Sequence, residues 1–262
     1  MDGVASAWCF WKQHKDFELY PGIYQKDEEL DLQLFADRDI FMVDFSYPLK
    51  ETKQILEVCK SLTMLDHHEG FFKMLEVLGT HPKLNTYFCT NKNSGCVISW
   101  EFLNPHEPVP QALLHIQDRD LWRFELPFTR EINAALFLED YTNFEVFDTV
   151  IQDLDMLVDI GKILVRDQAK RTRKVAYGAQ EIDGTWSVNA PRDLVSEVGN
   201  LLCKIPLESG ELPLYVDCWS VYKDTLDHSL RSVGEFDVSA VAKKHGGGGH
   251  KNAAGYKEKF YD

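Results

Sequence analysis

The sequence lacks several features that mark common protein classes. It has no run of about 18 apolar residues and no basic start followed by an apolar stretch, so we expect neither a membrane span nor a secretion signal. Its 6 cysteines include no CxxC pair, which favours buried free thiols over a zinc site or a disulfide framework. These absences predict a soluble, cytoplasmic protein.

Positive charge is also scarce. The chain has 28 Lys and Arg against 42 Asp and Glu, and its net charge is −14. Long nucleic acid binds mainly through neutralisation of its phosphates, so we do not expect long duplex nucleic acid as a partner. The net charge does not exclude a small anionic substrate, because a bound metal ion overrides the sign of the global charge locally.

The first half of the chain alternates strand-like and helical segments. Short segments at 40–43, 61–65 and 86–89 are strand-like, and the apolar run at 40–43 is typical of a strand covered on both faces. Segments with helical spacing surround these runs: 3–14, 50–61, 94–102 and 111–117. This order predicts an α/β fold, with a doubly wound parallel sheet in an N-terminal domain over residues 1–142.

The second half has a different pattern. Residues 143–175 predict one long amphipathic helix or two in series, which we interpret as a helical linker. Beyond it, Asp183-Gly184 lies between two strand-like flanks and predicts a hairpin. A helix over 193–204, strands over 213–223 and 226–233, and a helix over 237–244 follow. We therefore expect a smaller α/β domain over 176–262.

Titratable side chains follow two of the predicted strands directly. Asp44 ends the first strand, and Asp66, His67 and His68 end the second. In open α/β sheets, sites form at the carboxyl ends of the strands, so these groups should converge. Carboxylate with imidazole suits manganese, iron or a similar divalent ion.

The run HGGGGHKNAAGY at 245–256 is the second unusual feature. A flexible linker would explain the glycines, but a helix precedes them and a strand-like segment follows. We interpret the run as a loop that lets backbone N–H groups approach a phosphate, with Gly247, Gly248 and Gly249 beside His250 and Lys251.

Together these residues resemble the DHH phosphoesterases. The motifs that carry the resemblance cover essentially the whole chain: VDFSYP at 43–48, LDHHEG at 65–70, DRDLW at 118–122, SLRS at 229–232 and GGGGHKNAAG at 246–255. The layout is most similar to the group of oligoribonucleases (nanoRNases) and cyclic-nucleotide phosphodiesterases. The resemblance implies a metal-binding catalytic domain followed by a DHH-associated substrate-binding domain.

The resemblance also implies a role for each site residue. Two divalent ions, expected to be manganese, would be held by Asp2, Asp44, His67 and Asp118, with Asp120 as the second choice for Asp118. His68 would contact the scissile phosphate or protonate the leaving group, and Asp66 would orient the histidines. Phosphate binding would fall to Arg231, Gly247, Gly248, Gly249, His250 and Lys251.

The start of the chain departs from the family pattern. The first motif of the family has a strand and a histidine upstream, whereas here only Asp2 and Gly3 match it. This difference predicts either that the sequence is truncated at its start or that one metal position has been lost.

The activity that the resemblance implies is hydrolysis of short oligonucleotides to mononucleotides through two-metal activation of water. The alternatives are a cyclic-nucleotide or cyclic-dinucleotide phosphodiesterase, a phosphomonoesterase acting on 3′-phosphoadenosine 5′-phosphate, and a degenerate nucleotide-binding protein. The expected partner is a short oligonucleotide or a small phosphorylated nucleotide, and a homo-oligomer is left open.

Overall fold

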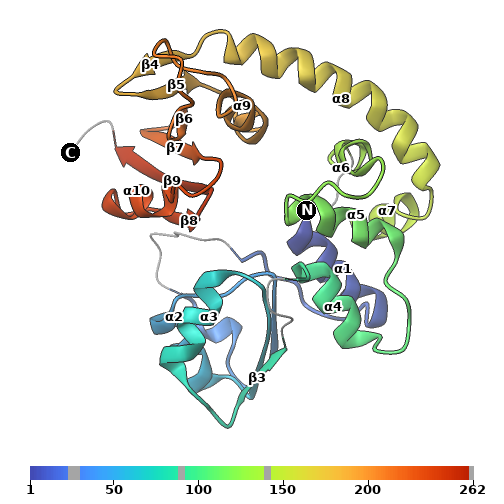
Figure 1. The fold of residues 1–262 in the computed structure, drawn as a ribbon. Coiled ribbons are helices and arrows are strands. Elements are labelled where there is room, and N and C mark those ends of the chain that lie inside the picture. Colours follow the sequence, from blue (N-terminus) through green and yellow to red (C-terminus); the bar gives the residue numbers. More distant parts are fainter. Residues whose placement is uncertain (23–29, 88–91, 139–142, 260–262) are drawn as a thin grey trace. The chain divides into compact units, whose positions relative to one another are not determined.

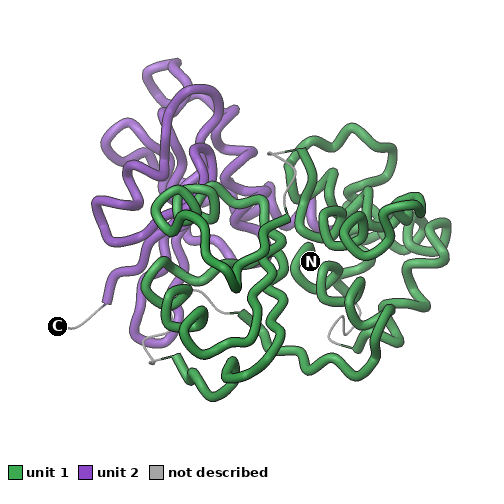
Figure 2. Tube along the Cα trace, turned by 90° about the horizontal axis from the view of Figure 1, so that it is seen from below, with its two compact units in different colours: residues 1–165 green, residues 166–262 purple. Residues whose placement is uncertain are grey.

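The chain forms two compact units. The computed structural model describes residues 1–22, 30–87, 92–138 and 143–259 (Figure 1). One unit spans residues 1–165 and the other spans residues 166–262 (Figure 2). The segment interpreted as a linker contains α7 (Phe144–Val150) and α8 (Leu154–Ala176), and the division between the units falls inside α8.

A three-stranded parallel sheet organises the first unit. Its strands are β1 (Asp39–Val43), β2 (Ser61–Leu65) and β3 (Leu84–Tyr87), which are neighbours in this order. The crossovers contain α2 (Leu49–Val58) and α3 (Glu69–Leu78). The predicted α/β fold with a parallel sheet is thus confirmed. The third strand begins two residues before its predicted start, and residues 88 and 89 lie outside the described residues.

Both faces of this sheet are covered by helices. Successive side chains of a strand point to opposite faces, and Met64 and Leu65 of β2 are both fully buried. Met64 belongs to a cluster with residues of α2 and α3, whereas Leu65 packs with residues of α1 (Asp2–Gln13) and α4 (Gly95–Leu103). Burial on both faces explains why these two successive residues of β2 are both apolar.

The remaining helices of this unit pack with α1 and α4. They are α5 (Gln111–Asp120), α6 (Thr129–Leu136), α7 and the first part of α8. Trp8 lies at the centre of their shared cluster, stacked on Trp100 and in edge contact with Phe147. No helix in the described part of the chain is long and apolar enough to span a membrane.

A six-stranded mixed sheet organises the second unit. The strand order is β4-β5-β6-β7-β9-β8. The bounds are β4 (Gln180–Ile182), β5 (Thr185–Asn189), β6 (Val216–Tyr222), β7 (Thr225–Arg231), β8 (Gly248–His250) and β9 (Ala253–Lys259). The predicted hairpin joins β4 to β5, with Asp183 at φ 49° and Gly184 at φ 74°, as such a two-residue turn requires.

Helices lie on the two faces of this second sheet. Val198 of α9 (Val195–Leu202) packs with Cys218 of β6, whereas α10 (Val238–Lys244) packs with Leu230 of β7. Cys218 is paired with Ser229, the neighbour of Leu230, so the two helices contact opposite faces. The described cysteines are free and buried, as expected: Cys9, Cys59, Cys96, Cys203 and Cys218.

Candidate metal centre

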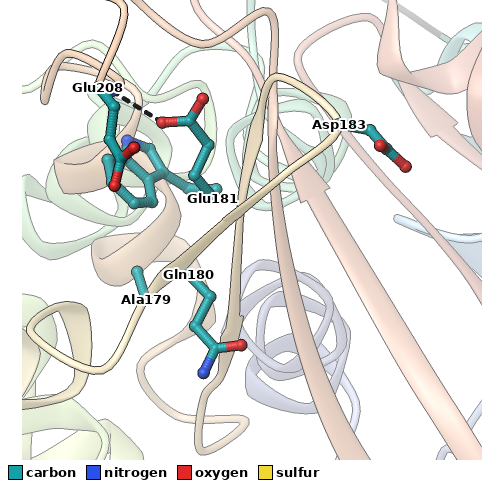
Figure 3. A pocket seen from close by; sticks show the side chains of 6 residues that line it. Ala179, Gln180, Glu181, Asp183 and Glu208 are labelled. Atoms are coloured by element: carbon teal, nitrogen blue, oxygen red, sulfur yellow. Dashed lines mark hydrogen bonds between the residues drawn. The ribbon is translucent and has the colours of Figure 1, made fainter.

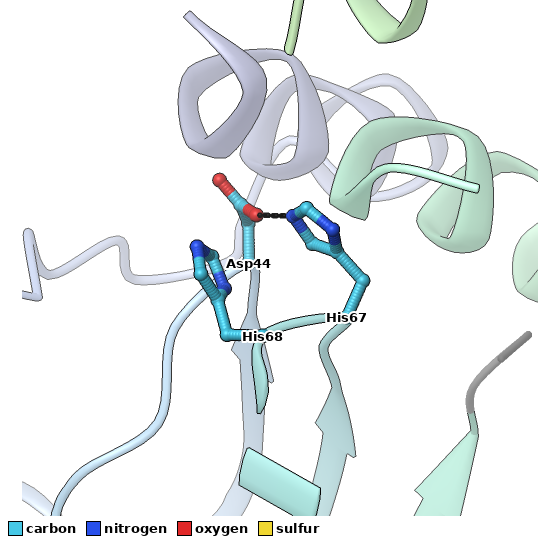
Figure 4. A group of neighbouring side chains, drawn as sticks. All are labelled: Asp44, His67 and His68. Atoms are coloured by element: carbon cyan, nitrogen blue, oxygen red, sulfur yellow. Dashed lines mark hydrogen bonds and ion pairs between the residues drawn. The ribbon is translucent and has the colours of Figure 1, made fainter. Parts of the chain in front are cut away.

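The two predicted strand ends meet at the carboxyl edge of the parallel sheet. Asp44 follows β1 with a left-handed backbone (φ 51°), and its N–H donates to the Leu65 carbonyl at the end of β2. Its Oδ1 lies 3.1 Å from Nε2 of His67. His67 and His68 lie on either side of the Asp44 carboxylate in Figure 4. Parallel pairing of β1 with β2 therefore brings these groups together as predicted.

Asp66 fixes the two histidines. It is fully buried, and its Oδ1 accepts hydrogen bonds from the backbone N–H of His67 at 2.7 Å and of His68 at 3.1 Å. The same oxygen lies 2.6 Å from Nδ1 of His68. An ionised carboxylate only accepts, so Nδ1 of His68 carries the hydrogen and Nε2 is directed elsewhere.

The charges of this pair reinforce each other. Burial opposes ionisation of Asp66, but the hydrogen bond from His68 and the charge of its ring keep the Asp66 pKa below its usual value. Burial likewise opposes a charged His68, but Asp66 raises the His68 pKa above its usual value. The Asp66 carboxylate therefore stabilises the charged form of the His68 imidazole.

Asp2 enters the same region from α1. It is buried, and its carboxylate accepts from the Ser94 hydroxyl at 2.8 Å and from the backbone N–H groups of Gly95 at 2.7 Å and Cys96 at 3.0 Å. Asp2 therefore caps the N-terminus of α4, where unpaired N–H groups favour a negative charge. Its Oδ2 also lies 3.7 Å from Nε2 of His67.

His67 is common to two groups of metal-ligand type. One group contains Asp44, His67 and His68, and the other contains Asp2, His67 and Asp120. Within each group, the ligand atoms lie within 4.8 Å of one another. Asp120 contributes from the last turn of α5, with its Oδ2 3.5 Å from Nε2 of His67.

The electrostatics of these groups favour a cation. Burial and the neighbouring charges of Asp2 and Asp120 raise the pKa of Asp44 well above its usual value. Burial and the charge of Asp2 raise the pKa of Asp120 to about 6. Carboxylates crowded in this way repel one another, and a divalent ion would relieve the repulsion. The donor set of carboxylate oxygens and imidazole nitrogen fits manganese or a similar ion.

Asp118, the first choice from the sequence, lies in a different environment. Its carboxylate accepts from the backbone N–H groups of Glu125 at 2.9 Å and Leu126 at 3.1 Å, and from the Thr129 hydroxyl at 2.5 Å. These hydrogen bonds outweigh the effect of burial and lower the pKa of Asp118. In the structure Asp120 lies in a group of metal-ligand type, whereas the Asp118 carboxylate binds the loop that follows α5. Which of the two aspartates binds metal remains a prediction.

This difference predicts opposite effects for the two aspartates. Asp118→Ala should lower the free energy of unfolding by about 2–4 kcal/mol, because it removes several hydrogen bonds to a buried charge. Asp120→Asn should not lower the free energy of unfolding, because it relieves repulsion between carboxylates. It should weaken manganese binding. Urea unfolding and calorimetric manganese titration would measure both effects. Weaker manganese binding by a fully stable Asp118 variant would contradict the assignment.

Two glycines that make room for Asp44 were missed as site residues. A Cβ built on Gly95 would lie 2.5 Å from Cβ and 2.7 Å from Oδ1 of Asp44, and a Cβ on Gly3 would lie 3.2 Å from its Oδ2. The sequence indicates Gly95 only as a helix start. Its contact with Asp44 depends on how α4 crosses the sheet, which no local pattern shows.

The second unit brings two of the predicted phosphate-binding residues onto one face of its sheet. Arg231 of β7 is paired with Ala253 of β9, and Ala253 is paired with His250 of β8. Residues paired across strands share a face, so Arg231 and His250 lie two strands apart, about 10 Å. Arg231 donates to the Ser196 hydroxyl at 3.1 Å, and burial lowers its pKa.

Two of the four glycines in the run have a packing reason that requires no ligand. A Cβ on Gly247 would lie 2.1 Å from the Gly255 carbonyl oxygen, and one on Gly249 would lie 2.5 Å from the Ala254 Cα. Gly248 begins β8, so part of the predicted loop is an edge strand. Lys251 forms an ion pair with Glu235 at 2.7 Å. A role for these residues in phosphate binding remains a prediction.

Three rings stack beside this run. Tyr256 lies between His228 and His245, with centroid distances of 4.4 Å and 4.3 Å. Nδ1 of His228 lies 2.8 Å from Oδ2 of Asp217. Burial lowers the pKa of His228, but the Asp217 hydrogen bond and the charges of Asp217 and Glu258 more than compensate, so the pKa is raised.

The raised pKa of His228 predicts a pH-dependent contribution to stability. The folded state binds the proton more tightly than the unfolded state, so the contribution is complete below about pH 6.5 and is lost as pH rises through the folded pKa. The difference in unfolding free energy between the native chain and His228→Asn should therefore be larger at pH 6 than at pH 9. Equal differences at the two pH values would contradict the assignment.

A pocket of about 550 Å³ in the second unit shares no residue with these groups (Figure 3). Glu181, Asp183 and Glu208 line it together with Trp186. An acidic lining repels phosphate, so we do not assign this pocket to an anionic substrate.

The fold and the site together define an α/β protein with an acidic, histidine-containing cluster at the carboxyl edge of a parallel sheet. No protein-family model matches the chain. An uncharacterized protein of Acanthamoeba polyphaga mimivirus is 33% identical over 282 aligned positions, which include 97% of this chain. The chain spans 64% of that relative's length.

The solved structures that resemble the chain include the following two. A pGpG-specific phosphodiesterase from Vibrio cholerae has a TM-score of 0.50 and 11% identity, covering 100% of this chain and 91% of that one. An exopolyphosphatase-related protein from Bacteroides fragilis has a TM-score of 0.47 and 16% identity, and the match covers 87% of this chain and 67% of that one. At 11% identity the first likeness concerns the fold, and it agrees with the predicted α/β architecture.

Proposed function

We propose that this chain is a metal-dependent phosphohydrolase of the DHH type that cleaves phosphodiester bonds in short oligonucleotides. The observation that carries the proposal is the convergence of Asp2, Asp44 and Asp120 on Nε2 of His67, with the Asp66–His68 pair beside them. The shared fold of the Vibrio cholerae phosphodiesterase supports this class of reaction, and its substrate pGpG supports a dinucleotide-sized substrate.

Each residue has a defined task in this proposal. Asp44, His67, Asp2 and Asp120 would hold divalent ions, with manganese preferred. The bound ions would polarise the phosphoryl group and favour attack by water. His68, held by Asp66 through Nδ1, keeps a proton that it donates to the leaving oxygen. Arg231 and His250 would bind a further phosphate.

The alternative with its own support is a phosphodiesterase specific for linear dinucleotides, because the Vibrio cholerae protein acts on pGpG. Substrate length separates the two proposals. An enzyme for short oligonucleotides degrades a five-nucleotide RNA stepwise, whereas a dinucleotide-specific enzyme leaves it intact.

The test is hydrolysis by the purified chain with manganese, with magnesium and with a chelator. The substrates are pGpG, a five-nucleotide RNA, cyclic AMP and 3′-phosphoadenosine 5′-phosphate. We expect manganese-dependent release of mononucleotides from pGpG and from the RNA. Tight nucleotide binding without hydrolysis under every condition would overturn the proposal in favour of a binding protein.

A further inference from the structure

An aromatic loop follows the helical turn that carries Asp120. The loop, Leu121–Phe128, contains Trp122, Phe124 and Phe128, whose φ angles are 55°, 54° and 66°. Bulky side chains rarely adopt this left-handed conformation, so the surrounding structure must hold it in place. Such local strain is concentrated at functional sites, which makes the loop a candidate for binding.

Hydrogen bonds anchor the loop at several points. The Asp118 carbonyl accepts from the N–H groups of Arg123 at 2.9 Å and Phe124 at 3.3 Å, in addition to the carboxylate contacts described above. The Arg123 guanidinium donates to the Lys92 carbonyl at 2.7 Å. The rings are therefore presented on a fixed backbone.

The loop borders the candidate metal centre on two sides. Trp122 is two residues from Asp120, so their Cα atoms are at most about 7 Å apart. On the other side, Arg123 contacts Lys92, which is two residues from Ser94, the donor to Asp2. A molecule whose phosphate lies at the metal centre would thus have the loop within reach.

The exposed rings of the loop lie beside cationic side chains of α6 and α8, and the loop itself contains both Arg123 and Glu125. Trp122 is 40% exposed and Phe128 is 51% exposed. Trp122 packs edge to face on Phe124 with centroids 4.9 Å apart, and the Arg130 guanidinium lies 3.7 Å from the Phe124 ring. Lys162, which also forms an ion pair with Asp159 at 3.1 Å, lies 5.6 Å from the Phe128 ring. In a chain with a net charge of −14, this local combination of rings and cations matches single-stranded nucleic acid.

We propose that Trp122, supported by Phe124, stacks on a nucleobase of the substrate whose phosphate lies at the candidate metal centre. This inference rests on the proposed function and adds a base-binding position to it. Stacking tolerates every base, because each base has a π-face. The position would therefore select nucleotides over other phosphate esters without selecting a sequence.

The test compares Trp122→Ala and Trp122→Phe with Tyr177→Ala, a control at an aromatic side chain that is 95% exposed. The substrates are pApA and its analogue without bases. For Trp122→Ala we expect KM for pApA to rise about tenfold, with the analogue unaffected. Trp122→Phe keeps a ring and should lie near the native value. An unchanged KM for pApA, or an equal rise for both substrates, would overturn the inference.

A second readout separates this inference from the proposed function. If the native chain hydrolyses neither substrate, the proposed reaction fails, and fluorescence anisotropy with labelled pApA and labelled analogue in calcium still tests the stacking. A preference for pApA that Trp122→Ala abolishes supports the inference. If the native chain shows no preference for pApA, the inference is overturned. It is also overturned if Trp122→Ala changes only the sedimentation of the chain, because the loop would then bind a second copy.

Discussion

Asp44→Asn is expected to lower turnover by at least about 100-fold. Loss of a group that only supports a metal ligand already lowers metal affinity or activity about 10- to 100-fold, and Asp44 is itself a proposed ligand. Asparagine tolerates the left-handed backbone at this position, and it removes charge from a crowded site, so the chain should stay folded. Steady-state hydrolysis of pGpG in manganese would measure the loss.

Asp37 offers a matched control for this variant. It also has a left-handed backbone, with φ 57°, and it is exposed. Asp37→Asn therefore makes the same chemical change in a similar conformation outside the site, and its activity should equal that of the native chain. Activity retained by Asp44→Asn would show that hydrolysis does not depend on the metal groups described here.

Gly95→Ala is expected to have an effect of similar size without removing any ligand. The new Cβ would lie 2.5 Å from the Asp44 Cβ, so the aspartate must move. A displacement of about 1 Å at a reacting site can cost about 100-fold in rate. We therefore expect at least that loss, together with weaker manganese binding.

Gly70→Ala is the control for this substitution. Gly70 is the second residue of α3 and has open space around its Cα, so alanine there should be neutral or slightly stabilising. Hydrolysis and manganese titration should be measured for both variants. Native activity in Gly95→Ala would show that Asp44 does not need its observed position.

The strands of the parallel sheet and the convergence of Asp44 with His67 were predictable because their sequence signals are local. The apolar runs 40–43 and 61–65 end in polar residues, and parallel pairing places both ends at one edge of a sheet. The pairing of Asp44 with His67 follows from that geometry alone. The hairpin at Asp183-Gly184 is equally local, since its turn needs positive φ at both residues.

The choice between Asp118 and Asp120 was not predictable in the same way. Both lie in the last turn of α5, and residues two apart on a helix point about 200° away from each other. Only one of them can face the sheet edge, and which one depends on how α5 packs. The positions of Asp2 and Gly95 beside Asp44 likewise depend on the packing of α1 and α4.

The glycine run shows a different limit of sequence reasoning. Consecutive glycines suggest a loop shaped for a ligand, but close contact between two backbones also requires glycine, here at two of the four positions. In the structure Gly247 and Gly249 lie too close to β9 for any side chain. The sequence alone does not distinguish these two reasons, because it does not show that β8 and β9 are neighbours.

The edges of the second sheet bear on the solubility of the chain. Among the described residues, the outer strands β4 and β8 have three residues each, whereas the inner strands β6, β7 and β9 have seven. Short edge strands offer few unpaired backbone groups to another chain, which is a common protection against aggregation. Growth of fibrils by addition of strands to this sheet is therefore disfavoured.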